Sequence, residues 1–257
     1  AHRGKKTQHK GHAEQRIAHW NNLICDCEKT GHRATATFAT ATRLCQKTDF
    51  LAISAACPRT GPALSGAMAK LYFHYSTMNA GKSTLLLQAA HNYRERGMAT
   101  LLLTAALDGR EGHGRIGSRI GIGAEALTFD AATDMVGLIE SRGRGCACIF
   151  IDEAQFLSPD QVWQLARAVD DLRVPIMCYG LRVDFRGLLF PGSATLLALA
   201  DEMREVRTIC HCGKKATMVV RQDAEGKAIR EGAQVQIGGN ETYISLCRRH
   251  WREAVGR

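Results

Sequence analysis

A short apolar run, a loop that ends in Gly-Lys-Ser and a helical run follow one another at residues 70–96. Residues 70–75 are apolar and aromatic, and residues 84–96 carry leucine and alanine at helical spacing. The loop between them consists of Ser76, Thr77, Met78, Asn79, Ala80, Gly81, Lys82 and Ser83. In a phosphate-binding loop, backbone N–H groups surround the phosphates, the lysine contacts the β- and γ-phosphates, and the serine hydroxyl binds Mg²⁺. The alternative is a chance Gly-Lys-Ser in a turn, because Ser76 stands where the motif has its first glycine.

Further apolar runs predict a mainly parallel sheet. Residues 100–104 and 146–151 are typical of buried strands, and the second run ends in Asp152 and Glu153. Beside a phosphate loop, the first carboxylate can hold the hydration shell of Mg²⁺ and the second can act on the group that attacks the γ-phosphate. An Asp-Glu pair that starts a helix after a strand is the ordinary alternative. More strands are expected at 174–179 and 205–209, and helices at 131–140, 159–168 and 194–201. Alternation of strands and helices predicts an α/β fold of the P-loop NTPase type, with helices on both faces of the sheet.

Six glycines lie among basic residues in the segment 108–123. The arginines are Arg110, Arg115 and Arg119. This composition predicts a mobile loop that faces phosphate, with a solvated linker as the alternative.

Two pairs of potential metal ligands flank the polar C-terminal part of the chain. Cys210 and Cys212 precede it, and Cys247 and His250 follow it. The segment between the pairs has too little apolar sequence for a core of its own. A structural Zn²⁺ bound by the four side chains would supply the missing cross-link. The alternatives are buried thiols with a surface histidine, and His211 in place of one ligand.

The net charge of +9 is concentrated at the beginning of the chain. Residues 1–67 contain ten Lys and Arg against four Asp and Glu, a net of +6, so residues 68–257 carry only +3. All seven methionines lie at or after Met68, and residues 1–67 lack helical or strand periodicity. We expect a basic extension of low order with no assigned function. It is upstream sequence from a misplaced start, an organelle-targeting segment, or a binding arm in which Cys25, Cys27 and His32 hold a metal.

Composition argues against a membrane or nucleic-acid partner. The longest apolar stretches, such as residues 101–107, are far shorter than the roughly 18 to 20 residues of a membrane-spanning helix. No apolar signal-peptide core opens the sequence, so the cysteines predict reduced thiols or metal ligands in a cytoplasmic protein. Few aromatic residues interleave with the basic residues Lys214, Lys215, Arg248, Arg249 and Arg252, as base stacking would require.

Four motifs in order resemble the type II thymidine kinases, and most closely their bacterial branch. They are LYFHYSTMNAGKST at 71–84, DEAQFL at 152–157, CYGLRVDFRG at 178–187 and IGGNETYISLC at 237–247. In that branch a serine likewise opens the phosphate loop, and the zinc ligands likewise fall as Cys-x-Cys and Cys-x₂-His. The resemblance divides the chain into a P-loop α/β kinase domain at 68–209 and a small zinc-binding lasso domain at 210–257.

The resemblance implies transfer of the ATP γ-phosphate to the 5′-hydroxyl of thymidine, with Glu153 as the general base. ATP and Mg²⁺ would be bound by the phosphate loop together with Asp108, Gly109, Arg110, Asp152, Glu153, Ala154 and Gln155. Thymidine would be bound by Met78, Leu181, Phe185, Phe190, Gln234, Val235, Gln236, Ile237, Gly238 and Tyr243. The resemblance also implies a homotetramer and feedback inhibition by dTTP. The alternative from another class is a zinc-containing P-loop ATPase that acts on nucleic acid.

Overall fold

The computed structural model of the protein describes residues 68–107, 114–235 and 242–257. The expectations for the leading segment 1–67 therefore lie outside the described residues. The same holds for six of the predicted site residues, which are Asp108, Gly109, Arg110, Gln236, Ile237 and Gly238.

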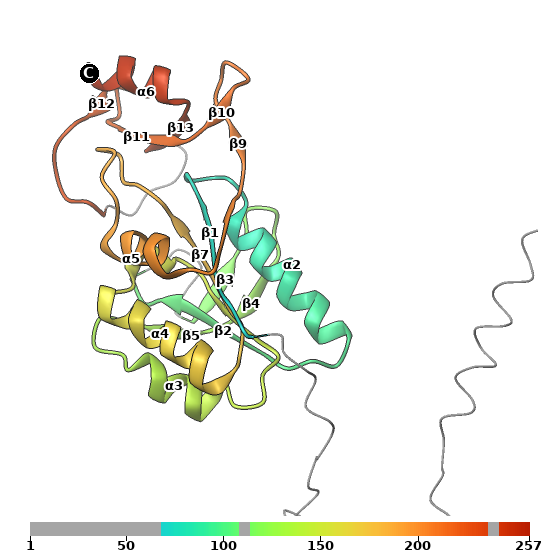
Figure 1. The fold of residues 1–257 in the computed structure, drawn as a ribbon. Helices are drawn as coiled ribbons and strands as arrows, with labels where there is room; N and C mark the ends of the chain where they lie inside the picture. The colour runs from blue at the N-terminus through green and yellow to red at the C-terminus, as the bar shows by residue number, and fades with distance from the viewer. Residues whose placement is uncertain (1–67, 108–113, 236–241) are drawn as a thin grey trace, which may run out of the picture. The chain divides into compact units, whose positions relative to one another are not determined.

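Six parallel strands form the central sheet, in the order β5-β2-β6-β7-β1-β8 (Figure 1). The strands are β1 (Leu71–Ser76), β2 (Thr100–Ala105), β5 (Leu127–Phe129), β6 (Cys148–Ile151), β7 (Ile176–Leu181) and β8 (Glu202–Glu205). This arrangement confirms the parallel α/β fold. The strand expected at 205–209 was placed wrongly, because β8 ends at Glu205. The following strand β9 (Thr208–Ile209) pairs with β10 (Lys215–Ala216) in a separate sheet.

Helices cover both faces of the sheet, as predicted (Figure 1). On one face lie α3 (Met135–Arg142), α4 (Pro159–Leu172) and α5 (Pro191–Leu199). On the other lie α2 (Lys82–Glu95) and the hairpin of β3 (Arg115–Gly117) and β4 (Gly123–Glu125). Successive side chains of β2 point to opposite faces of the sheet, so this strand contributes to the cores on both faces. Leu101 and Leu103 belong to the core under α3, α4 and α5, and Leu102 belongs to the core under α2.

Within the segment that was expected to be a mobile glycine-rich loop, the described residues from 115 onward form this hairpin. Ile116 is buried against α2, and the Ser118 N–H donates to the Ile122 carbonyl across the turn. Gly121 has φ +85°, a conformation that favours glycine. The glycines therefore shape a tight antiparallel turn.

The C-terminal part is a small module with its own core. Its three-stranded antiparallel sheet consists of β12 (Ala228–Ile229), β11 (Met218–Gln222) and β13 (Tyr243–Leu246), followed by α6 (Arg248–Val255). Trp251 and Val255 of α6 pack with Val220 and Leu246 in one apolar cluster. None of the described helices is both long and apolar enough to cross a membrane.

Candidate active site

The loop after β1 places a buried lysine at the start of α2. Asn79 and Gly81 have φ of 62° and 81°, and this left-handed backbone turns the chain from the strand into the helix. The Lys82 Nζ donates to the Thr77 carbonyl at 2.8 Å. The Ser76 hydroxyl donates to the Val206 carbonyl at 2.5 Å, so the serine that replaces the first motif glycine ties β1 to the chain after β8.

Two carboxylates stand at the end of β6, beside the loop. Asp152 is buried and its carboxylate is hydrogen-bonded to Ser83. Burial raises the pKa of Asp152 well above its usual range, and the charge of Glu153 raises it further, whereas Ser83 and Lys82 lower it. Its Oδ1 atom is buried and lacks a hydrogen-bond partner among the described residues. A carboxylate with an open oxygen beside a serine hydroxyl fits Mg²⁺.

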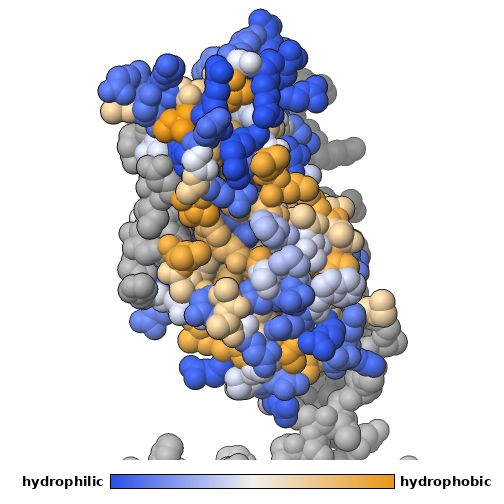
Figure 2. All heavy atoms as spheres, turned by 90° about the vertical axis from the view of Figure 1, so that its left-hand side faces the viewer, coloured by the Kyte–Doolittle hydropathy of each residue, from blue (hydrophilic) through white to orange (hydrophobic). Residues whose placement is uncertain are grey.

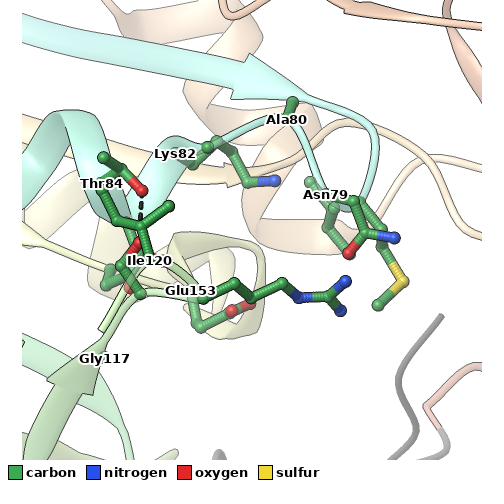
Figure 3. Close-up of a pocket in the computed structure, with 14 residues that line it drawn as sticks. Asn79, Ala80, Lys82, Thr84, Gly117, Ile120 and Glu153 are labelled. Atoms are coloured by element: carbon green, nitrogen blue, oxygen red, sulfur yellow. Dashed lines mark hydrogen bonds between the residues drawn. The ribbon is translucent and has the colours of Figure 1, made fainter. Parts of the chain in front are cut away.

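Lys82 and Glu153 face one cavity of about 320 Å³ (Figure 3). It is lined by Met78, Asn79, Ala80, Gly81, Lys82, Ser83, Thr84, Gly117, Ser118, Arg119, Ile120, Asp152, Glu153 and Leu181. The Thr84 and Ser118 hydroxyls share a short hydrogen bond, which fastens the turn of the β3-β4 hairpin to α2. The cavity therefore combines the backbone N–H groups of the loop, the Lys82 ammonium group, two carboxylates and an arginine. This set is suited to phosphoryl transfer.

Gln155 connects Glu153 to the end of β7. Its Nε2 donates to Glu153 Oε2 at 2.5 Å, and its Oε1 accepts the Leu181 N–H at 2.9 Å. A Cβ atom at Gly180 would lie 2.9 Å from this Oε1, so the close approach depends on glycine at that position. Both ends of the buried Gln155 amide thus have protein partners. The amide connects the Glu153 carboxylate to the backbone of Leu181 and so fixes its position.

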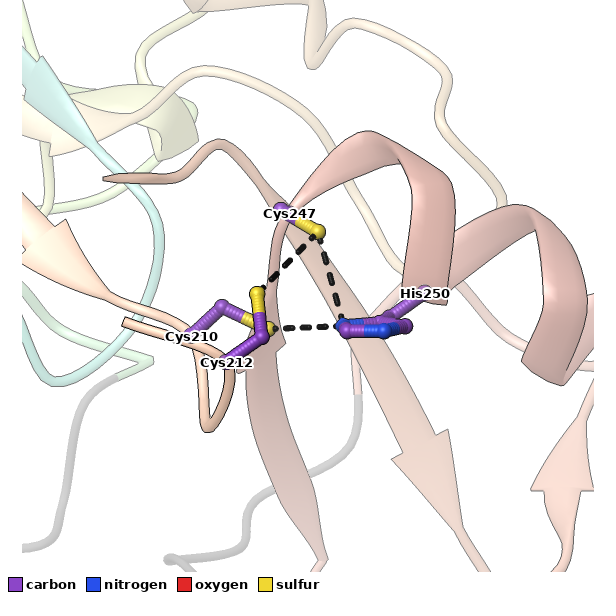
Figure 4. A group of neighbouring side chains, drawn as sticks. All are labelled: Cys210, Cys212, Cys247 and His250. Atoms are coloured by element: carbon purple, nitrogen blue, oxygen red, sulfur yellow. Dashed lines mark hydrogen bonds between the residues drawn. The ribbon is translucent and has the colours of Figure 1, made fainter. Parts of the chain in front are cut away.

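The four predicted metal ligands come together in the C-terminal module (Figure 4). Their ligand atoms all lie within 4.8 Å of one another. The His250 Nδ1 lies 3.3 Å from Cys210 Sγ and 3.5 Å from Cys247 Sγ, and the Sγ atoms of Cys212 and Cys247 are 3.9 Å apart. Two sulfurs on a tetrahedral zinc with bonds of about 2.3 Å are about 3.8 Å apart. The cluster therefore fits a structural zinc site.

Neighbouring groups favour the thiolate form of Cys210. Burial alone would raise the pKa of the Cys210 thiol, but N–H groups of Cys212 and Cys247 and the His250 ring lower it below its usual value. His211, the alternative ligand, instead stacks on His250 with ring centroids 4.3 Å apart. The surface of the C-terminal module is mostly hydrophilic in Figure 2. The core beneath it is small, with seven buried residues in one cluster, and a metal cross-link would compensate for this small size.

Comparison with known proteins identifies the family. A model of the thymidine kinase family matches residues 69–251. The thymidine kinase of Ruegeria pomeroyi is 76% identical over 191 residues, which are 74% of this chain and 96% of that protein. The thymidine kinase of Jannaschia sp. is 71% identical over 191 residues, 74% of this chain and 98% of that protein. This chain belongs to the thymidine kinase family. The thymidine kinase of Rhizobium meliloti, 67% identical over 192 residues, covers 73% of this chain and 98% of its own length.

Thymidine kinase membership directs attention to the apolar residues beside the cavity. Phe185 and Tyr243 are buried in one cluster with Val219, and Met78 packs against it. Met78 also lines the cavity around Lys82 and Glu153, which we call the phosphate cavity. The apolar cluster and this cavity therefore share a wall. Phe190 is buried elsewhere, with its ring edge-on to Phe156 at 6.2 Å. Of the predicted thymidine contacts, the structure thus joins Met78, Phe185 and Tyr243, places Leu181 in the cavity wall, and sets Phe190 apart.

Several residues that line or support the candidate site were not predicted from the sequence. Ser118 and Ile120 line the cavity from the hairpin turn, and Ser245 donates to the Met78 carbonyl at 2.7 Å. The glycines at 117 and 121 could have indicated a turn that presents the residues between them. Asp184 and Arg221 are both buried beside Phe185. For Arg221, the signal in the sequence was a charged residue directly after the apolar residues 218–220.

Proposed function

We propose that this protein transfers the γ-phosphate of ATP to the 5′-hydroxyl of thymidine. The observation that carries the proposal is the match to thymidine kinases over residues 69–251, which include the cavity with Lys82, Asp152 and Glu153. Neither the family match nor the relatives support the alternative of an ATPase that acts on nucleic acid.

The reaction follows from the residues around the cavity. The Glu153 carboxylate accepts the proton of the 5′-hydroxyl while that oxygen forms a bond to the γ-phosphorus. The bond between the γ-phosphorus and its bridging oxygen breaks, and its electron pair leaves with ADP. Lys82 and the loop N–H groups bind the phosphates, and Gln155 holds Glu153 in place. Asp152 and Ser83 would hold Mg²⁺, which neutralises phosphate charge when bound.

We place the thymidine site at the wall that the phosphate cavity shares with the apolar cluster of Phe185 and Tyr243. Met78, Leu181, Phe185 and Tyr243 would contact the nucleoside, and Gln234 and Val235 would approach it from the lasso segment. Phe190 stays a predicted contact of thymidine, and in the structure its ring packs against Phe156.

Three finer assignments belong to the same proposal. Feedback inhibition by dTTP is supported by Met78, which belongs to both the phosphate cavity and the apolar cluster, so one molecule can span the two. A homotetramer is part of the proposal because the motifs of the chain resemble those of the type II thymidine kinases. The reaction would take place in the cytoplasm, with Zn²⁺ as a structural ion.

The test is ADP release from the full chain with Mg-ATP, with and without thymidine. We expect turnover that depends on thymidine and that falls by about 10² to 10⁴ in Glu153→Gln, the loss typical of a missing general base. Glu140→Gln, at an exposed position of α3, is the matched control and should keep full activity. ADP release that does not depend on thymidine and that increases when DNA or RNA is added would refute the thymidine kinase activity. It would favour the ATPase that acts on nucleic acid.

A further inference from the structure

Arg221 of β11 is a buried cation. Arg221 is only 3% exposed, and its Nε atom is buried without a hydrogen-bond partner among the described residues. Among the described residues it has no carboxylate partner within ion-pair distance. Burial of a guanidinium is unfavourable unless its donors are satisfied. A hydrophobic residue would therefore serve better if the position required packing alone.

The guanidinium group binds the backbone of the segment 231–233. Nη2 donates to the Glu231 carbonyl at 3.0 Å, and Nη1 donates to the Ala233 carbonyl at 2.9 Å. A Cβ atom at Gly232 would lie only 2.6 Å from Nη2, so glycine is required there for this approach. The planar fork of arginine reaches two carbonyls at fixed spacing, which the single ammonium of lysine cannot do in the same way.

The same guanidinium group lies over Phe185. Its Cζ atom is 3.9 Å from the ring centroid. One group thus holds the segment 231–233 and the aromatic ring of the apolar cluster together.

A second contact fastens the next residue of this segment. The Gln234 Nε2 donates to Asp184 Oδ2 at 3.2 Å. Asp184 is itself fixed, because it accepts the N–H groups of Arg186 and Leu188 and pairs with the Arg186 side chain at 2.9 Å. Residues 231–234 are therefore attached at two points to the turn that bears Phe185.

We propose that Arg221 is a positioning residue for the nucleoside pocket, which sets residues 231–234 against Phe185. This role rests on the proposed function, because it takes Phe185 and Gln234 to be part of the thymidine site. It predicts that loss of the guanidinium group weakens thymidine binding while the phosphate cavity, which Arg221 does not line, keeps its affinity for ATP.

The test compares Arg221→Met and Arg221→Lys with Arg182→Met. Arg182 is the matched control, because it also donates to a backbone carbonyl, that of Thr217 at 3.1 Å, and lies over an aromatic ring, that of Tyr75. We expect Arg221→Met to raise the KM for thymidine about tenfold to a hundredfold, as for lost hydrogen bonds from a charged group. The kcat and the KM for ATP should stay within about threefold of the starting protein. Arg221→Lys should fall between, and Arg182→Met should leave the KM for thymidine unchanged.

The outcomes separate the role from a general loss of structure. An unchanged KM for thymidine in folded Arg221→Met, or an equal loss in kcat and in the KM for both substrates, would overturn the proposal. If Arg221→Met does not fold or loses its zinc, Arg221→Lys decides, because it keeps charge and bulk, and an unchanged KM there also overturns it. If the starting protein itself shows no dependence on thymidine, the proposed function fails first, and that result is distinguishable from a failure of the positioning role.

Discussion

Backbone strain marks two residues of the cavity. Three non-glycine residues among those described have a positive φ, namely Asn79, Glu153 and Arg173. Arg173 is the C-cap of α4, where this conformation is common. The other two line the cavity. A non-glycine residue in this left-handed conformation costs about 1–3 kcal/mol of conformational free energy. The fold therefore contains backbone strain at the residue whose carboxylate is the proposed general base.

His74 of β1 makes stability sensitive to acid. Burial, with the charge of Arg204, lowers the pKa of His74 to about 4, and its ring stacks on Tyr179 with centroids 4.5 Å apart. The unfolded chain, with a histidine pKa near 6.5, binds this proton first. His74 therefore reduces the free energy of unfolding as the pH falls from about 6.5 to about 4, and has no such effect at neutral pH. We expect His74→Phe, which keeps the stacking, to lose less stability than the starting protein between pH 7.5 and pH 5.

Urea unfolding at the two pH values measures this difference. All other titrating groups are shared, so the difference between the two proteins isolates His74. Equal shifts of the urea midpoint in both would contradict the prediction.

At the residue scale, the sequence predicted which residues come together better than it predicted their contacts. Residue type and spacing singled out Gly81, Lys82, Asp152 and Glu153, and the structure places all four around one cavity. Gln155 was expected at the nucleotide. Its hydrogen bond to the Leu181 N–H could not be foreseen, because it joins segments that lie 26 residues apart in the sequence. Arg221 was missed for the same reason.

Among the elements, α6 joins the metal cluster to the apolar cluster. It begins directly after Cys247, and it carries His250 on its first turn. The Trp251 Nε1 donates to the carbonyls of Phe185 and Val219, at 3.2 and 3.1 Å. The position of α6 therefore determines both a metal ligand and the backbone beside Phe185.

Removal of zinc should be visible in the fluorescence of Trp251. Without the metal, the small core of the module loses its cross-link, so we expect a strong chelator to shift tryptophan emission to longer wavelength as Trp251 becomes hydrated. Trp163 is already 56% exposed, and its replacement by phenylalanine should leave the shift intact, whereas Trp251→Phe should remove it. Zinc release with unchanged Trp251 emission would show that the module stays folded without metal.

Element length decided which parts of the fold could be predicted. The strands β1, β2, β6 and β7 are buried runs with a clear apolar signal. In contrast, β5 has three residues, which is too short for a periodic pattern. No residue of β8 is buried, so the expected strand was drawn toward the more apolar residues that follow it. The helix α6 was not predicted, since only Trp251 and Val255 form its buried face.

For the molecule as a whole, the contacts at the start of β1 indicate how far the chain can be shortened from its N-terminus. The Leu71 N–H donates to Asp201 Oδ2 at 2.7 Å, and the Asp201 N–H donates back to the Leu71 carbonyl at 2.9 Å. Lys70 and Glu202 form an ion pair beside them at 2.8 Å. These contacts fasten the start of β1 to the start of β8. The matched family region begins at the same place, at residue 69.

We therefore expect a chain that begins at Met68 to keep thymidine-dependent turnover within about twofold of the full chain, because catalysis needs only the contacts that position the reacting groups. The measurement is ADP release with and without thymidine from both chains, after zinc content has been matched. In the shortened chain, Asp201→Ala leaves the Leu71 N–H without its partner and should lower the melting temperature, which tests whether this contact secures the new terminus. A shortened chain that folds and binds zinc but has less than about a tenth of the turnover would contradict the prediction, since an effect that large means that residues 1–67 contribute to the transition state.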